Sequence, residues 1–371
     1  MAVVGLNFGE QFLPIYLRHP RVAHVAIVEP DEERRRSVGD RYGIEDRFAS
    51  LEQALNDKRI DAVHILSPVA SHARQSIAVL GSGRHCACAV PMATGIPDLQ
   101  AVIAAQRSSA KNYMMMETSV YGREFLAVRD LYRKGSLGRI TFYRGFHIQN
   151  LDGFPRYWLG YPPMAYITHA LSPLLALLET GVESVTCTGS GRLTPDRVGD
   201  YDNRFPLEVG LFRLQGSEVI ADVTMSFFQT ARSFLEGFSV YGDAMEVEWP
   251  EHEGGPLSTF ELLPLEEGAR GRRCRERTFE PPDWTELLPP EVSAFARDSE
   301  LRLRPGSEPV LVKAWHGGSH PYLAHEFVSS IVEGRKPAVD AVTAARWTAP
   351  GIHAHESAMA GGKQTAVTRF G

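Results

Sequence analysis

Apolar runs alternate with amphipathic stretches along the first third of the chain. The predicted strands are 2–6, 24–29, 60–67, 85–90 and 112–117. The predicted helices between them are about 9–19, 31–42, 71–82 and 94–108. Strands that are apolar throughout and alternate with helices are typical of a parallel sheet covered on both faces. The pattern therefore predicts an α/β, doubly wound domain over residues 1–121.

The pattern changes after about residue 122. The predicted helices there are 121–134 and about 165–180, and the predicted strands are 140–149 and those near 184–192, 206–215, 218–228 and 234–249. Successive strands with helices set apart are typical of an α+β domain with a large, mostly antiparallel sheet. We therefore expect a second, substrate-binding domain over 122–371. It includes an irregular excursion with weak strands at about 250–315 and is closed by helices at about 321–334 and 341–360.

Composition and charge narrow the class of protein. The 371 residues carry a net charge of −6, so there is no concentrated positive field for a nucleic-acid partner. No apolar run approaches the roughly 18 residues of a membrane span, and no cleavable leader is visible, so we expect a cytoplasmic protein without a membrane partner. The four cysteines lack metal-ligand spacing, and no metal site is expected. With nucleic acid, membrane and metal excluded as partners, we expect a small-molecule substrate.

The turn after the first predicted strand resembles a dinucleotide-binding loop. Such a loop uses glycines so that the backbone approaches a pyrophosphate at a helix N-terminus. Gly5 fits the first of the three glycine positions of such a loop, and Asn7 stands at the second. Gly9 supplies conformational freedom of the backbone one residue ahead of the third position. Asn tolerates a positive φ, so we expect the turn from Gly5 through Phe8 to Gly9 to form. A plain strand–turn–helix is the alternative.

Two further elements support a nicotinamide dinucleotide. Glu29 ends the second predicted strand, where a carboxylate accepts hydrogen bonds from ribose hydroxyls and repels a 2′-phosphate. This favours NAD over NADP as the cofactor. Ser67 and Pro68, followed by His72, close the strand at 60–67 and open a helix, where a cofactor-binding segment is expected.

These segments resemble the glucose–fructose oxidoreductase and inositol dehydrogenase family. Asp61-Ala62-Val63, Gly135-Ser136-Leu137-Gly138 and His325-Glu326-Phe327 add to the resemblance, which covers essentially the whole chain. Most members end the fifth strand in Glu-Lys-Pro, whose lysine helps to move a proton during hydride transfer. Here the matching residues are Ala89-Val90-Pro91, so the lysine is absent and Pro91 is retained.

The next segments are similar to the lysine-lacking branch that contains NAD-dependent glycosidases. Met114-Met115-Met116-Glu117-Thr118 runs on to Tyr121, and Tyr166 and His169 form a Tyr-x-x-His pair. The dehydrogenases carry an acid and a glycine ahead of the histidine, and this chain lacks both. The resemblance implies NAD, a sugar or glycoside substrate, and Tyr121, Tyr166 and His169 as catalytic residues. It also implies a homodimer or homotetramer.

The residues themselves support part of this assignment. His169 lies near the start of the predicted helix, where the helix dipole favours a neutral imidazole that can accept a hydroxyl proton. Tyr166 lies one helical turn earlier on the same face, and Tyr121 needs a nearby cation, Arg123 or Lys111, to act as a base. The alternatives are a core histidine and a core tyrosine. Glu117 is either a site carboxylate or a helix N-terminal acid.

Loop residues supply candidates for substrate contacts. These are Arg123, Arg156, Tyr157, Trp158, Arg232 and His316. Aromatic side chains stack on sugar faces, and arginine binds anionic substituents. A zinc site formed by His316, His320 and His325 is a weaker alternative, because Pro321 interrupts the spacing.

Three functions follow from these patterns. The first is an NAD-dependent glycosidase that oxidises a ring hydroxyl at C3, eliminates the C1 substituent, adds water and returns the hydride. The second is a simple NAD-dependent sugar or polyol dehydrogenase, in which His169 is the only acid–base group. The third is an NAD-binding regulatory protein without catalysis, which the missing lysine motivates.

Overall fold

The computed structural model describes residues 1–250, 252, 254–302, 306 and 308–371. The chain divides into two compact units. The first unit comprises Met1–Tyr121, Asp283–Ala345 and Gly371, and the second comprises Gly122–Pro282 and Arg346–Phe370. The segment 283–345, which we had expected in the second domain, packs with the first.

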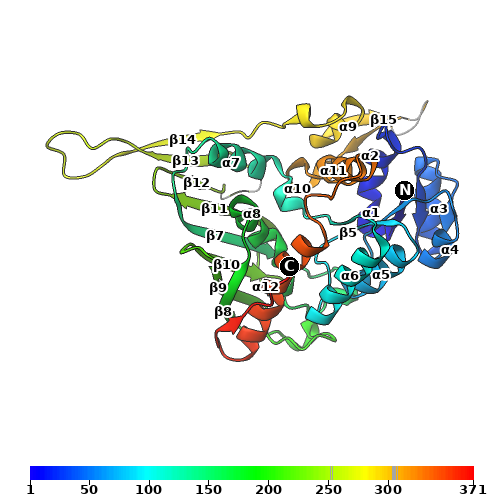
Figure 1. Ribbon diagram of the computed structural model, residues 1–371, viewed down its shortest axis with the longest axis horizontal. Coiled ribbons are helices and arrows are strands. Elements are labelled where there is room, and N and C mark those ends of the chain that lie inside the picture. Colours follow the sequence, from blue (N-terminus) through cyan, green and yellow to red (C-terminus); the bar gives the residue numbers. More distant parts are fainter. Residues whose placement is uncertain (251, 253, 303–305, 307) are drawn as a thin grey trace. The chain divides into compact units, whose positions relative to one another are not determined.

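The first unit contains a six-stranded parallel sheet in the order β3-β2-β1-β4-β5-β6. Its strands are β1 Ala2–Val4, β2 Ala26–Val28, β3 Arg47–Phe48, β4 Ala62–Ile65, β5 His85–Cys88 and β6 Tyr113–Met115. Its helices are α1 Leu6–Gly9, η1 Glu10–Phe12, α2 Leu13–Arg18, α3 Glu32–Tyr42, α4 Leu51–Leu55, η2 Val69–Ser71, α5 His72–Gly81, α6 Ile96–Ser109 and η3 Thr118–Val120. Figure 1 shows α5 beside α6, and the two pack together. The predicted α/β class is confirmed. The short elements β3 and α4 were not predicted.

The segment 283–345 adds a helical layer to the first unit. Its elements are η7 Thr285–Leu287, α9 Pro290–Ser293, η8 Ala294–Ala296, β15 Ser299–Arg302, β16 Pro309–Val312, α10 Trp315–Gly318 and α11 His320–Val332. α11 packs on α2, η1 and η8. The Asn112 side chain donates to Ser330 Oγ at 3.0 Å, and Met115 N–H donates to the Val339 carbonyl at 3.0 Å. These bonds tie the segment to β6.

The second unit contains a nine-stranded sheet in the order β14-β13-β12-β11-β7-β10-β9-β8-β17. Its strands are β7 Ile140–Gln149, β8 Val182–Ser190, β9 Leu207–Leu214, β10 Ile220–Ser226, β11 Phe234–Gly242, β12 Met245–Glu248, β13 Leu257–Leu262, β14 Cys274–Phe279 and β17 Thr365–Ala366. Among the described strands of this second sheet, only β7 and β10 pair in parallel. The predicted mostly antiparallel sheet is therefore confirmed. The stretch 250–315, predicted to be an irregular excursion with weak strands, supplies β13 and β14 to this sheet.

Helices cover one face of this second sheet. They are α7 Arg123–Arg133, η4 Arg156–Trp158, η5 Pro163–Tyr166, α8 Thr168–Leu178, η6 Pro195–Arg197 and α12 Ala341–Met359, which begins in the first unit. Figure 1 shows α8 lying across the strands, and it packs on β7, β10 and β11. A Cβ on Gly145 of β7 would lie 2.0 Å from the Ala170 carbonyl oxygen, and Tyr143 Oη donates to that oxygen at 2.7 Å. Glycine at this position therefore lets the start of α8 lie directly on β7.

Candidate active site

The turn after β1 requires glycine at its first residue. Gly5 has φ 85°, a conformation that L side chains rarely adopt. A Cβ on Gly5 would lie 2.8 Å from the Leu66 carbonyl oxygen, which is backbone and cannot move aside. Gly5 N–H donates to the Val28 carbonyl at 2.9 Å. The turn is therefore held closely between the ends of β2 and β4, as a dinucleotide loop requires.

Asn7 and Gly9 serve different roles from those expected. Asn7 lies exposed within α1, and its φ is not positive, so the predicted positive φ falls on Gly5 instead. Gly9 is helical, with φ −64°. A Cβ at Gly9 would lie 3.0 Å from Val3 Cγ1. Gly9 therefore provides close packing of the helix on β1 rather than backbone freedom.

Glu29 lies where the sequence placed it, at the end of β2, and is only 5% exposed. Its carboxylate accepts Leu6 N–H at 2.9 Å and Asp31 N–H at 3.2 Å. Arg34 lies 3.8 Å away. A carboxylate has about four acceptor sites, so capacity remains for a ribose hydroxyl. The positions of Glu29 and of the Gly5 turn are therefore those that a bound dinucleotide requires. The Glu29 carboxylate also stabilises the turn through its hydrogen bond from Leu6 N–H.

Ser67 and Pro68 follow β4 as predicted, beside the Gly5 turn. Ser67 Oγ lies 2.9 Å from Ser71 Oγ, and Pro68 is exposed. His72, by contrast, is only 1% exposed. Its Nδ1 lies 2.8 Å from the Pro91 carbonyl oxygen and its Nε2 lies 2.9 Å from the Ser67 carbonyl oxygen. His72 therefore ties the Ser67 loop to the end of β5 and presents no free polar group.

Two carbonyl acceptors on one imidazole require two N–H donors, which only the protonated ring has. Burial opposes the charge, but the Cys88 sulfur and the carbonyls of Pro91 and Ser67 outweigh it and raise the pKa of His72 to about 9. The folded state therefore binds the proton of His72 more tightly than the unfolded state does. This stabilises the fold fully below the ordinary pKa of 6.5, and the stabilisation is lost as the pH rises toward 9.

We expect the wild-type protein to lose about 3 kcal/mol of unfolding free energy over that pH window, relative to His72→Gln. Urea unfolding at a series of pH values measures this difference. His85→Gln is the matched control, because burial lowers the pKa of His85 and its charge is not needed in this window. Parallel pH profiles for wild type and His72→Gln would contradict a charged His72.

Phe8 and His316 lie together in the first unit. Their ring centroids are 6.2 Å apart, and His316 has φ 50°. His316 thus lies beside the Gly5–Gly9 turn, and its predicted contact with the substrate stays a prediction. His320 stacks on Phe12 at 4.3 Å, and His325 Nδ1 lies 3.1 Å from His19 Nε2. Among the described residues no three side chains form a metal cluster, so the zinc alternative has no support.

The ends of β5 and β6 supply the remaining candidates of the first unit. Val90 and Pro91 are buried after β5, and no acid–base group stands at the position of the missing lysine. Glu117 is fully buried and accepts Ser119 N–H at 3.0 Å, so it caps η3. Tyr121, which ends the first stretch of this unit, is half-buried. Lys111 precedes β6 whereas Tyr121 follows it, so Lys111 is not placed to activate Tyr121.

In the second unit, His169 and Tyr166 converge as predicted. His169 is the second residue of α8 and is 3% exposed. Tyr166 ends η5, and its ring centroid lies 5.0 Å from that of His169 in an edge-on arrangement. The two side chains can therefore reach one substrate.

Three further residues of this cluster were not predicted. His147 of β7 stacks on His169 with ring centroids 5.4 Å apart and an interplanar angle of 13°. Its Nδ1 lies 3.0 Å from Glu236 Oε2, and its Nε2 lies 3.2 Å from Gln149 Oε1. The sequence signal that could have identified His147 is the two-residue spacing of Tyr143, Gly145 and His147 along the predicted strand. The burial of all three residues shows that they share the covered face of β7.

Glu236 also changes the electrostatics of His169. Its Oε2 lies 3.8 Å from His169 Nδ1. The dipole of a helix N-terminus disfavours a cation by about 0.3–1 kcal/mol, whereas a carboxylate at about 4 Å favours it by about 4 kcal/mol at an effective dielectric constant of 20. The carboxylate outweighs the dipole, so the sequence-based argument from the dipole alone is incomplete.

Aromatic side chains line the cluster. Trp158 lies 5.4 Å from Tyr166 and 6.2 Å from Phe227 between ring centroids, and Tyr157 is exposed beside it at 5.6 Å. Arg156 is exposed at the start of η4. This surface suits the apolar face of a sugar ring.

The two other arginine candidates lie on separate elements. Arg232 is exposed in the turn before β11, the strand that carries Glu236. Arg123 opens α7, and its Nε donates to Glu124 Oε1 at 3.1 Å. Arg232 therefore remains a substrate candidate, while Arg123 is engaged with a neighbouring acid.

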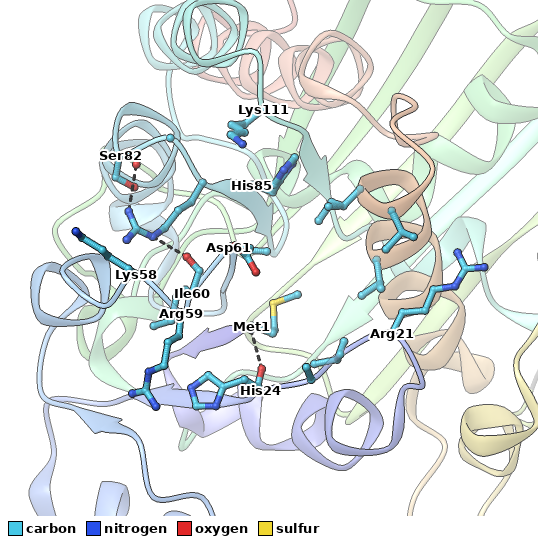
Figure 2. A pocket seen from close by; sticks show the side chains of 18 residues that line it. Met1, Arg21, His24, Lys58, Arg59, Ile60, Asp61, Ser82, His85 and Lys111 are labelled. Carbon is cyan, nitrogen blue, oxygen red and sulfur yellow. Dashed lines mark hydrogen bonds between the residues drawn. The ribbon is translucent and has the colours of Figure 1, made fainter.

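A separate pocket of about 610 Å³ lies in the first unit. Figure 2 shows Lys58, Asp61, His85 and Lys111 around it. Lys58 and Asp61 precede β4, His85 is the first residue of β5, and Lys111 precedes β6, so the pocket lies at the amino edge of the parallel sheet, whereas dinucleotides bind at the carboxyl edge. Arg59, which also lines it, pairs with Asp46 and Asp57 at 2.6 Å each. The pocket therefore does not belong to the cofactor site.

Comparisons with known proteins also find a dinucleotide-binding fold at the start of the chain. Residues 1–117 match the model of the GFO/IDH/MocA oxidoreductase family, NAD-binding Rossmann fold. A glycosyl hydrolase family 109 protein 1 from Bacteroides fragilis is 29% identical over 146 residues, which are 37% of this chain and 31% of that relative. In this match the chain spans less than a third of the relative's length.

Other relatives match over the whole chain. A glycosyl hydrolase family 109 protein from Streptomyces coelicolor is 22% identical over 407 residues, covering 100% of this chain and 82% of the relative. The solved levoglucosan dehydrogenase in complex with NADH and levoglucosan shares the fold, with a TM-score of 0.77, 18% identity and 99% of both chains covered. Residues 1–117 thus match the GFO/IDH/MocA Rossmann oxidoreductase family, and the chain has distant homology to the family 109 glycosyl hydrolases.

Proposed function

We propose that this protein is an NAD-dependent enzyme that acts at a sugar ring hydroxyl, at C3, and cleaves a glycoside. The sequence of steps is oxidation, elimination, water addition and re-reduction. The cluster of buried His169 with the partly exposed Tyr166 and Glu236, beside Trp158, carries this proposal, because it combines acid–base groups with an aromatic surface for a sugar. The similarity to family 109 glycosyl hydrolases supports it.

The first unit provides the cofactor-binding residues. The turn from Gly5 to Gly9 would hold the pyrophosphate, Glu29 the ribose hydroxyls, and Ser67 and Pro68 the other side of the dinucleotide. Glu29 favours NAD over NADP because its charge repels a 2′-phosphate. Bound NAD supplies the hydride acceptor for the oxidation and returns the hydride at the end.

The chain's own residues supply the proton transfers. His169 accepts the proton of the ring hydroxyl as that carbon is oxidised to a ketone, and returns it in the last step. The ketone acidifies the neighbouring C–H bond at C2, and a second base removes that proton so that the C1 substituent leaves. Tyr121 is assigned as this second base by its resemblance to the glycosidases, and Tyr166, adjacent to His169, is the other candidate.

A simple sugar dehydrogenase is the second candidate function. It needs one acid–base group, and His169 with Glu236 is sufficient for that. The shared fold with levoglucosan dehydrogenase over 99% of both chains is consistent with it. In this case NADH leaves and no bond at C1 breaks.

A substrate panel distinguishes the two. Purified protein with catalytic NAD is incubated with nitrophenyl glycosides and with free sugars, while aglycone release and NADH are measured. Aglycone release without net NADH is the expected result. Stoichiometric NADH from a free sugar, without aglycone release, would establish the dehydrogenase. Neither activity, with NAD still bound, would indicate a regulatory protein.

Tyr121→Phe tests the second base. We expect oxidation of the ring hydroxyl to persist, because His169 is unchanged, while loss of the C2 proton slows by at least about 10-fold. Exchange of deuterium from D2O into C2 of the sugar measures this step. Tyr166→Phe is the matched comparison, and a larger loss of exchange in that variant would transfer the role to Tyr166.

A further inference from the structure

The sheet of the second unit brings a glutamate under the catalytic histidine. β7 and β11 are antiparallel, and their register places Glu236 directly opposite His147. Directly opposed residues have Cβ atoms about 4.5–5.5 Å apart on one face of the sheet. α8 packs on both strands, so His169 at its start lies over this pair.

One carboxylate oxygen serves both imidazoles. Glu236 Oε2 lies 3.0 Å from His147 Nδ1, a hydrogen-bond distance, and 3.8 Å from His169 Nδ1. The two rings are almost parallel. His147 and His169 are 1% and 3% exposed, so both rings are shielded from bulk water. Gln149 closes the far side of His147 at 3.2 Å from Nε2.

We propose that Glu236 is a positioning residue that directs the Nδ1 edge of His169 and balances its charge during proton transfer, and that His147 holds Glu236 in place. The proposal deepens the function proposed above and rests on it for the role of His169 in turnover. Glu236 does not itself take the proton.

The proton transfer then follows from the geometry. Because Nδ1 of His169 faces Glu236, we assign the proton transfer to its Nε2. The hydroxyl O–H bond breaks, an N–H bond forms at Nε2, and the ring becomes an imidazolium. Its Nδ1–H then faces a carboxylate, and this attraction grows as the charge develops. The same ring returns the proton from Nε2 in the re-reduction.

Titratable groups face His169 from the elements around it. Tyr166 lies on η5, His147 on β7 and Glu236 on β11. β10 presents Met225, which does not titrate, opposite His147. α7 also packs on α8 and carries Glu124, which pairs with Arg123. Glu236 is therefore the acid expected to set the protonation of His169.

Glu236→Gln tests the proposal by kinetics. We expect kcat to fall about 10- to 100-fold with KM changed by less than about twofold, because the lost interaction acts when the charge develops. The acidic limb of the kcat/KM profile should move to lower pH by about 1 unit, because removal of the carboxylate makes His169 harder to protonate. Glu236→Asp keeps a carboxylate and should return the acidic limb of the kcat/KM profile part of the way to its wild-type pH. Glu261→Gln, an exposed acid of β13 paired with Arg275, is the matched control.

Histidine NMR gives a second measurement that needs no substrate. In 15N-labelled full-length protein, long-range spectra report the tautomer and titration midpoint of each ring, with His169→Gln and His147→Gln used for assignment. We expect the Nδ1–H form of His169 in wild type and its loss in Glu236→Gln. An unchanged tautomer and midpoint in Glu236→Gln would overturn the proposal. A wild type without sugar oxidation or glycoside cleavage would instead contradict the proposed function, while the NMR result still decides the positioning role.

Discussion

His169→Gln is expected to lower turnover by about 100- to 10,000-fold, the range that a positioned general base contributes. Glutamine retains much of the volume and polarity of the ring but cannot accept a proton near pH 7. The loss should appear in kcat for both hydride transfer and glycoside cleavage, because oxidation of the hydroxyl precedes every later step. Stopped-flow measurement of NADH formation in a single turnover detects it.

The same variant should still bind NAD, with a Kd within about twofold of wild type, because the predicted cofactor residues lie in the first unit and His169 lies in the second. His252→Gln is the control, since His252 is exposed outside the cluster. If His169→Gln retained full turnover, the assigned proton acceptor would be wrong. Loss of NAD binding together with turnover would indicate a folding defect, which circular dichroism would reveal.

Gly5→Ala is expected to weaken NAD binding by at least about 10-fold. The substitution combines an unfavourable positive φ with a Cβ placed 2.8 Å from the Leu66 carbonyl oxygen. Together these cost about 2–4 kcal/mol, and the turn can avoid them only by moving away from the ends of β2 and β4. Titration calorimetry with NAD and urea unfolding measure the two consequences.

Gly9→Ala is the matched control within the same turn. Gly9 is helical, and its added Cβ would meet the side chains of Val3 and Leu66 at 3.0 and 3.2 Å, which can shift by a few tenths of an ångström. We therefore expect a smaller effect on both stability and NAD affinity. Equal losses in the two variants would show that packing alone, and not the φ of Gly5, decides the turn.

Elements with strong local patterns could be predicted from the sequence. The strand expected at 140–149 is β7 with the same bounds, and the helix expected at 341–360 is α12 Ala341–Met359. Both have an uninterrupted pattern of apolar and polar positions that is set by neighbours in sequence. β3 and α4 are too short to show a period, and the strand expected at 234–249 is divided by the turn between β11 and β12.

Pairing between distant segments could not be predicted. Glu236 and His147 are 89 positions apart, and only the register of β11 on β7 brings them together. The return of residues 283–345 to the first unit likewise depends on α11 packing on α2, which no local period reveals. His169 and Tyr166, three positions apart, could be predicted as a pair because one helical turn joins them.

Glu29 has two roles, one toward the cofactor and one within the turn, and together they limit how the preference for NAD or NADP can evolve. Its carboxylate both faces the expected ribose site and accepts the N–H groups of Leu6 and Asp31. A single substitution that admits a 2′-phosphate by removing this charge also removes at least one hydrogen bond from the turn expected to bind the pyrophosphate, because even glutamine keeps only one acceptor oxygen. A lineage moving from NAD to NADP would therefore pass through an intermediate that binds both dinucleotides poorly, unless a second change first stabilised the turn. Selection would act against that path one step at a time.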